Sequence, residues 1–218
     1  RLWLAKTLFP EICKGKAEIR ETDKEAELTF TWEDTTVTYR MRKDGMLGVR
    51  AHFHGKKGYP SLPVFGLAFE LPEQVSRFSW YGRGPWENYP DRRAGAGLGV
   101  YESTKKEQLA RYLKPQECGM HMETECVTVY RKDTLNNSDT SEETFGLTFR
   151  ACGEKFGFSC LPYTAEELEN ATHQEELPLP RRTVVCICGS VRGVGGIDSW
   201  GSDVEDPYRI SAQKDIVY

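Results

Sequence analysis

The sequence predicts an all-β protein built as one large antiparallel β-sandwich. Apolar and polar residues alternate with a period of two in most segments, as they do in half-buried strands. Turn-forming residues are frequent, with 20 glycines and 11 prolines in 218 residues, and aromatic residues, which favour strands, make up 11%. About ten strands without a linker or an internal repeat predict a single domain over residues 1–218.

Near the start, apolar residues alternate over 28–32, again over 37–41 and again over 47–53. Asp44 and Gly45 separate the last two segments and are a strong signal for a tight turn. We therefore expect a hairpin there. Further strands are expected at 65–71, 75–81, 123–131, 144–151, 155–161, 183–189 and 206–212.

One short helix is expected over residues 165–170. Thr164 stands at the N-cap position and Glu167 lies three residues later, which together form the capping-box pattern. The segment 133–143 is rich in polar turn residues, and we expect it to be a hairpin loop and the most mobile part of the chain.

Composition argues against several classes of protein. Hydrophobic residues make up 39% and charged residues 28%, as in ordinary globular domains and unlike disordered chains. The net charge is −4 and the Lys and Arg residues are scattered, so no nucleic-acid partner is expected. No apolar run approaches the roughly 18–20 residues that a membrane span needs, so no membrane partner is expected either.

The cysteines indicate a reducing environment. Their odd number and their spacing argue against a disulfide framework. Cys186 and Cys188 lie on the same face of one expected strand, either as a metal or redox pair or as two small buried apolar side chains, and we favour the second interpretation. A cytoplasmic location is expected, with the periplasm as the alternative. The seven cysteines are Cys13, Cys118, Cys126, Cys152, Cys160, Cys186 and Cys188.

The most informative segment is 81–92, which reads Y-G-R-G-P-W-E-N-Y-P-D-R. Glycine costs about 1 kcal/mol and proline about 3 kcal/mol inside a helix, and proline cannot donate to a strand ladder. We therefore expect an ordered loop. A second segment, 193–201, reads G-V-G-G-I-D-S-W-G. The residues that define the first loop are Gly84, Pro85, Glu87, Asn88, Tyr89, Pro90, Asp91 and Arg92.

Two more segments have recognisable motifs. Residues 112–121 read Y-L-K-P-Q-E-C-G-M-H, and residues 161–173 begin L-P-Y-T and end in histidine. In this order, the four segments resemble the C-terminal β-sandwich domain (small chain, domain 5) of lac-type β-galactosidases in glycoside hydrolase family 2. The resemblance covers residues 62–211. It implies a supersandwich like that of galactose mutarotases, in a fragment of a larger multidomain chain whose start is slightly truncated.

The resemblance also implies where the chemistry lies. Enzymes of this family hydrolyse terminal non-reducing β-D-galactose with retention, and their catalytic glutamates lie on an upstream TIM barrel. The sequence itself agrees with this placement. Glycoside hydrolysis needs a pair of carboxyl groups, one as acid and one as nucleophile or base, and no spacing among the loop carboxylates of this chain singles out such a pair. We therefore expect no catalytic residue in this chain, no hydrolysis by it alone, and a role in completing the rim of the active site.

The implied partners are the upstream domains of the same polypeptide and the galactoside substrate, in a parent enzyme that is a homo-oligomer. Parent enzymes of this family often use Mg²⁺ and Na⁺. No cofactor is expected within this chain.

Trp200 is the strongest candidate for substrate binding. A tryptophan in a glycine-rich loop has no strand to pack against, and an indole face stacks well on a pyranose; the alternative is a core aromatic. The resemblance implies that Trp200 reaches the active site of the barrel. Asp198 in the same motif is a second candidate, although Ile197 stands where lac-type enzymes commonly have another acid.

His121 and Glu117 are further candidates for the sugar pocket. His121 would either form a polar wall of that pocket or hold its loop by a hydrogen bond, and we weigh these roles equally. For the polar residues of the 84–92 loop we favour a structural role, because glycine and proline leave backbone groups there without partners.

Two alternative functions follow from the same residues. A freestanding enzyme similar to aldose 1-epimerases would need a histidine acid and a glutamate base, for which His121 with Glu117 or Glu123 is the plausible set. A stand-alone carbohydrate-binding module would use Trp86 and Trp200 as stacking platforms.

His52 and His54 project from one strand face with a spacing that suits a metal. A third ligand would have to come from elsewhere, with His121 or Cys118 as candidates. We favour ordinary exposed histidines and expect no metal site.

Overall fold

The computed structural model describes residues 16–72, 75–132 and 144–218, which excludes Cys13 and the loop expected at 133–143. The described residues are nearly all β and divide into two compact units. The first unit combines the described residues up to Val64 with Arg209–Tyr218, and the second is Phe65–Tyr208. The single domain over 1–218 stays a prediction.

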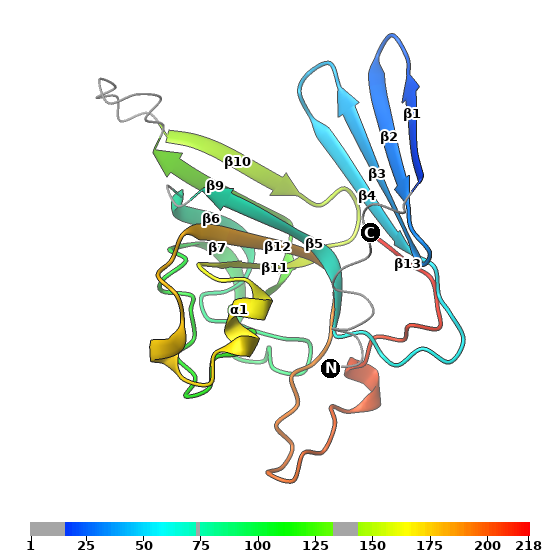
Figure 1. Cartoon of the computed structure of the whole chain (residues 1–218). Coiled ribbons are helices and arrows are strands. Elements are labelled where there is room, and N and C mark those ends of the chain that lie inside the picture. The colour runs from blue at the N-terminus through cyan, green and yellow to red at the C-terminus, as the bar shows by residue number, and fades with distance from the viewer. Residues whose placement is uncertain (1–15, 73–74, 133–143) are drawn as a thin grey trace. The chain divides into compact units, whose positions relative to one another are not determined.

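The first unit holds one antiparallel sheet, made of β1 (Lys16–Glu21), β2 (Glu25–Thr31), β3 (Thr35–Arg42), β4 (Leu47–Phe53) and β13 (Ile216–Val217). The strand order is β1-β2-β3-β4-β13 (Figure 1). The β3–β4 hairpin is the predicted one, and Gly45 has the positive φ, 81°, that its turn requires. Val37, Ala51 and Phe53 are buried on one face of the sheet.

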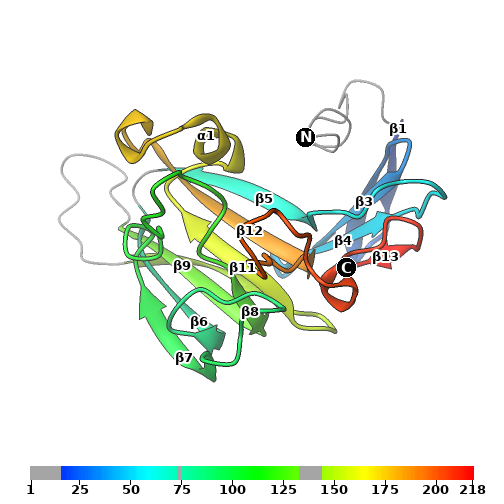
Figure 2. The same cartoon turned by 90° about the horizontal axis from the view of Figure 1, so that it is seen from below.

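The second unit is built from β5 (Val64–Pro72), β6 (Val75–Gly84), β7 (Gly97–Ser103), β8 (His121–Thr124), β9 (Cys126–Lys132), β10 (Thr144–Arg150), β11 (Phe156–Leu161) and β12 (Arg182–Val191). These strands form two sheets, ordered β10-β9-β6-β7 and β5-β12-β11-β8 (Figure 2). Phe78 and Trp80 on β6 meet Phe158 on β11, with ring centroids 5.9 and 5.6 Å apart, and all three are buried. The sheets face each other across an aromatic core, which confirms the predicted antiparallel β-sandwich.

The strand predicted over 123–131 is in fact two strands. β8 pairs with β11 in one sheet, whereas β9 pairs with β6 and β10 in the other. Glu123, next to the last residue of β8, has a positive φ of 54°, and between the two strands the Glu125 N–H donates to the Tyr81 carbonyl at 2.9 Å. The chain crosses from one sheet to the other at this corner, and the crossing does not interrupt the alternating pattern of the sequence.

β6 extends to Gly84, so the prediction that all of 81–92 is loop is wrong for its first four residues. A Cβ added at Gly82 would lie 2.5 Å from Thr124 Oγ1, and one at Gly84 would lie 2.8 Å from the Tyr101 ring. These glycines therefore serve close packing against neighbouring side chains rather than a turn. Residues 85–92 leave the sheet as the expected loop.

α1 (Ala165–Asn170) begins with the predicted capping box. Thr164 Oγ1 accepts the Glu167 N–H at 3.1 Å, and the Glu167 carboxylate accepts the Thr164 N–H at 2.9 Å. Leu168 anchors the helix in a small apolar cluster with Cys118 and Leu161. No helix in the described parts of the chain is long and apolar enough to cross a membrane.

The strand predicted at 206–212 is wrong. Asp206–Tyr208 is a 3₁₀ helix, and Ile210 forms only an isolated bridge with Leu62. Pro207 has no N–H to give to a ladder, which disfavours a strand there. The prediction also missed β1, β7 and β13.

Candidate functional site

The loop after β6 is tied to its surroundings by Glu87. One oxygen of this carboxylate, Oε1, accepts hydrogen bonds from the Arg92 guanidinium and from the Tyr112 hydroxyl. The other oxygen, Oε2, accepts the Gly119 N–H at 2.8 Å. Glu87 thus joins the loop to the 112–121 segment, so two of the four motifs meet at this side chain.

Asn88 and Tyr89 are almost completely buried, each at most 2% exposed. Asn88 Oδ1 accepts the Met122 N–H at 2.9 Å, and Asn88 Nδ2 donates to the Trp86 carbonyl at 3.0 Å. The Asn88 N–H donates to the Met120 carbonyl at 2.7 Å. These contacts satisfy backbone groups of an irregular loop, which supports the structural role favoured for its polar residues.

Asp91 joins this loop to the glycine-rich segment 193–201. Its carboxylate accepts the Val194 N–H at 3.0 Å and the Gly195 N–H at 2.7 Å. A Cβ added at Gly193 would lie 2.7 Å from the Asp91 carboxyl group, so only glycine allows this approach. One charged side chain therefore fixes the start of the segment that carries Trp200.

The remaining glycines of that segment shape the turn. Gly195 and Gly196 have positive φ values of 75° and 88°, a backbone conformation that glycine adopts without strain. Asp198 Oδ1 accepts the Trp200 N–H at 2.8 Å, and Asp198 Oδ2 accepts the Ser202 hydroxyl at 2.5 Å. These hydrogen bonds, with that of Ser202 the largest, lower the pKa of Asp198. The carboxylate therefore stays ionised and holds its own turn.

Trp200 is 93% exposed. Its backbone is held by Asp198, and its loop is held by Asp91. The alternative that Trp200 is a core aromatic is excluded for this chain, because its side chain is not buried. An exposed indole on an anchored loop is a ready surface for stacking on an apolar ligand face.

His121 lies in the core of the second unit and is 0% exposed. Its ring lies 4.4 Å from that of Trp80 and 5.1 Å from that of Phe158, measured between centroids. His121 Nε2 is 3.0 Å from Gln108 Oε1. Burial lowers the pKa of His121 to about 4, so the ring is neutral near pH 7. This position fits the second of the two roles considered, a hydrogen bond that holds a loop.

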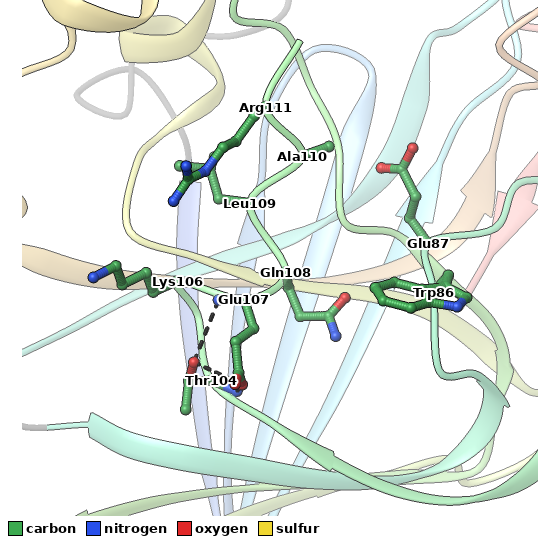
Figure 3. A pocket seen from close by; sticks show the side chains of 9 residues that line it. All are labelled: Trp86, Glu87, Thr104, Lys106, Glu107, Gln108, Leu109, Ala110 and Arg111. Atoms are coloured by element: carbon green, nitrogen blue, oxygen red, sulfur yellow. Dashed lines mark hydrogen bonds between the residues drawn. The ribbon is translucent and has the colours of Figure 1, made fainter.

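The segment 104–111 lines an open groove of about 660 Å³ that the sequence did not indicate. Figure 3 shows Gln108 between Trp86 on one side and Thr104 and Glu107 on the other. Trp86 is 74% exposed. One wall, Trp86 and Glu87, comes from the 81–92 motif, but the opposite wall comes from a segment without a motif, so the sequence did not predict the groove. Glu117 is exposed as well.

Six carboxylates were considered for glycoside hydrolysis, and five of them have close cationic or hydrogen-bond partners: Glu87, Asp91, Glu123, Asp198 and Asp203. The sixth is Glu117, whose pKa is raised by desolvation. Glu123 lies 3.0 Å from the Arg83 guanidinium and 2.8 Å from that of Arg93, and the hydrogen bond from Arg83 contributes most to lowering its pKa. The carboxylate of Asp203 pairs with Arg192. The Glu123 carboxylate therefore stays ionised and is a poor proton donor.

His52 and His54 lie in the first unit, with ring centroids 4.1 Å apart. The group that joins them is Asp215, whose Oδ2 is 2.9 Å from His52 Nε2. Neither of the candidates named for a third ligand, His121 and Cys118, belongs to this group. Asp215 follows His52 by 163 positions, and no spacing rule connects residues so far apart.

Comparisons with known proteins agree with these motifs. Residues 8–218 match the family described as "Beta galactosidase small chain". The "Beta-galactosidase small subunit" of Latilactobacillus sakei is 49% identical over 203 residues, which cover 90% of this chain and 63% of that protein.

Two longer relatives match over a smaller share of their length. The "Beta-galactosidase" of Streptococcus thermophilus is 36% identical over 202 residues, which cover 89% of this chain and 19% of that protein. The "Beta-galactosidase" of Halalkalibacterium halodurans is 33% identical over 229 residues, which cover 100% of this chain and 21% of that protein. The chain thus spans less than two thirds of the length of these curated relatives.

Proposed function

The chain belongs to the beta galactosidase small chain family, and from this premise we propose that it is the non-catalytic component of a β-galactosidase. It works with a larger component, which is either a separate large chain or the upstream part of the same polypeptide. The support is the coverage of the relatives: one is named a small subunit, and the others are β-galactosidases about five times as long as the match.

The complete enzyme hydrolyses terminal non-reducing β-D-galactose residues with retention, as a member of glycoside hydrolase family 2. Its two catalytic glutamates lie on the larger component, in a TIM barrel. The support in this chain comes from the hydrogen bonds that its carboxylates accept. Glu87, Asp91 and Asp198 are occupied by N–H and O–H donors that hold loops, which is a structural use of these groups.

Trp200 carries the proposal. It is 93% exposed, and its loop is anchored through Asp91 to the neighbouring motif. The indole supplies one apolar wall for the galactose ring, while the larger component supplies the contacts to hydroxyl groups. Asp198 and Asp91 hold that wall in place, and His121 supports the 112–121 segment from the core. Exposed Glu117 meets the substrate or the larger component.

The Mg²⁺ and Na⁺ of such enzymes belong to the larger component in this proposal. Both ions prefer oxygen ligands, whereas the group of potential metal ligands in the described residues contains two histidines and one carboxylate. The assembled enzyme is a homo-oligomer of the complete unit and is cytoplasmic, which suits the free cysteines of the described chain.

The test uses the assembled enzyme and compares Trp200→Ala with Trp200→Phe. Stacking is present in the ground state and the transition state alike, so its loss raises KM with little change in kcat. Aromatic stacking contributes about 1–3 kcal/mol, which corresponds to a rise in KM of about 5- to 150-fold for the alanine variant. Phenylalanine keeps a ring face and retains more affinity.

Trp86→Ala is the matched control, because Trp86 is also exposed and lies on the neighbouring motif loop. It should leave KM unchanged. Asp91→Ala should raise KM as the Trp200 variant does, and the double variant should be no worse than either alone, because both changes remove the same wall. Unchanged kinetics in Trp200→Ala, or an equal loss in Trp86→Ala, would contradict the proposal.

The alternative functions have less support. An epimerase would need His121 as an acid in contact with sugar, but His121 is 0% exposed and its pKa lies far below neutrality. A stand-alone binding module would use Trp86 and Trp200 together; binding of galactose by the purified chain alone would favour it.

A further inference from the structure

His52, His54 and Asp215 bring three potential metal ligands together in the first unit. Among the residues that the structure describes, this is the one group in which three such side chains offer ligand atoms within 4.8 Å of one another. The histidines are two positions apart around the end of β4, which places their rings on one face. Asp215 immediately precedes β13, the strand that pairs with β4.

The backbone holds Asp215 in place. The Gly55 N–H donates to Asp215 Oδ1 at 2.9 Å, which leaves Oδ2 facing His52 Nε2 at 2.9 Å. Gly55 itself is in close contact with the chain before Asp215, because a Cβ there would lie 2.5 Å from the carbonyl carbon of Lys214.

The histidines have a supporting contact of the kind common around metal ligands. Thr36 Oγ1 lies 2.9 Å from His54 Nε2 and fixes the orientation of that ring. The cluster is also accessible, because the side chains of His52 and Asp215 are 29% and 62% exposed. An ion can therefore enter from solvent without unfolding the sheet.

We propose that His52, His54 and Asp215 bind a divalent transition-metal ion, for which zinc is the best-suited candidate. Imidazole nitrogen and carboxylate oxygen are zinc ligands with bonds of about 2.0–2.2 Å, so ligand atoms around a tetrahedral ion lie about 3.3 Å apart. The 2.9 Å between His52 and Asp215 needs only a small adjustment to reach that distance. Three protein ligands leave a fourth position for water.

The ion would join β13 to β4. β13 has two residues, and it pairs with β4 through Ile216 and Val217. A metal held jointly by Asp215 and the histidines adds a link at this short pairing, and it stabilises the folded state by mass action. The proposal is independent of galactoside hydrolysis, and its test measures binding rather than turnover.

The first experiment is calorimetric titration of the full chain with Zn²⁺, after removal of metals with a chelator and without a histidine tag. One ion per chain is expected, with affinity reduced more than about 100-fold in His52→Ala and His54→Gln. His173→Ala is the matched control. His173 forms an ordinary surface pair with Glu176, with Nδ1 3.0 Å from the carboxylate, so its removal should leave zinc binding unchanged.

The second experiment guards against variants that fold poorly. Asp215→Asn keeps the size of the side chain and an acceptor for the Gly55 N–H, but it loses the negative charge. Zn²⁺ should raise the melting temperature of the parent chain and leave that of Asp215→Asn unchanged, while Mg²⁺ should affect neither. Absence of saturable 1:1 binding, or an equal loss in His173→Ala, or a zinc-dependent rise retained in Asp215→Asn, would overturn the proposal.

Discussion

Among single residues, His121 shows how burial can turn a residue with functional chemistry into a structural one. Histidine beside glutamine and glutamate in a motif suggests proton transfer or sugar binding. In the fold, its ring packs against Trp80 and Phe158 and its nitrogens face Gln108 and the Arg83 carbonyl. The neutral form is the one that suits this environment.

The stability of the chain should therefore fall on mild acidification. The pKa of His121 is about 4 in the folded chain, whereas it is about 6.5 in an unfolded chain. Above pH 6.5 the ring is neutral in both states and has no effect. Between pH 6.5 and 4 only the unfolded state takes up the proton, so the free energy of unfolding decreases by about 3 kcal/mol over this range.

Denaturant titration at several pH values measures this effect. His121→Gln, which cannot be protonated, should show a flatter profile between pH 6.5 and 4. His173→Gln is the comparison of opposite sign, because the hydrogen bond to Glu176 raises the pKa of His173, and its contribution is lost as pH rises. Parallel profiles for the parent chain and His121→Gln would show that folding does not lower the pKa of His121, and would contradict this prediction.

The sequence revealed the motif residues but not their partners. Trp200 could be chosen because a glycine-rich loop offers an indole little to pack against. The contacts of Asp91 with Val194 and Gly195 could not be predicted from the sequence. They use backbone N–H groups, which nearly every residue has, so no residue type marks them. The pairing of Asp215 with His52 was hidden for a related reason: it depends on which strands become neighbours.

Among the elements, α1 illustrates a structure that local sequence specifies well. It is only six residues long, and isolated helices of that length are not stable in water. It forms because the capping box satisfies its first N–H groups and because Leu168 is buried. Both signals lie within a few residues of the helix, which is why its position could be predicted.

Removal of the cap should destabilise this element measurably. Thr164→Ala removes the acceptor for the Glu167 N–H and should lower the free energy of unfolding by about 1 kcal/mol. Thr164→Ser keeps a hydroxyl and should lose much less. Chemical denaturation of the three chains gives the comparison, and equal stability of the alanine and serine variants would mean that the cap contributes nothing.

Some strands were predicted correctly and others were missed, and the difference has physical reasons. In β3, β4, β10 and β11, apolar and polar residues alternate or the strand ends at turn residues. The local sequence pattern was therefore enough to predict these strands. β6 and β7 contain glycines that pack against Thr124 and Tyr101, and a glycine within a strand is indistinguishable in sequence from a glycine in a loop. β13 is two residues long and exists only because β4 offers an edge.

At the scale of the whole molecule, the described cysteines indicate that the two units fold without disulfide bonds between them. The six that the structure describes are free thiols: Cys118, Cys126, Cys152, Cys160, Cys186 and Cys188. Burial raises the pKa of Cys160 to about 12 and that of Cys118 to about 11. Cys118 and Cys160 are therefore thiols at neutral pH and act as small apolar groups.

Two measurements follow for the intact chain. A reductant should leave the melting temperature unchanged, because folding uses no disulfide. Alkylation with iodoacetamide, read by mass spectrometry, should modify exposed Cys152 first and reach buried Cys118, Cys160 and Cys188 only after unfolding. A large drop in melting temperature on reduction, or early modification of Cys160, would contradict this view.

The first unit is discontinuous, since its sheet needs both the residues before Val64 and those from Arg209 onward. On a ribosome, β4 emerges long before β13, and all of Phe65–Tyr208 is synthesised between them. The edge of β4 therefore remains unpaired while the second unit is synthesised. Unpaired edges invite aggregation, so the nascent chain is most vulnerable in this interval, which ends when residues 209–218 emerge and β13 covers the end of β4.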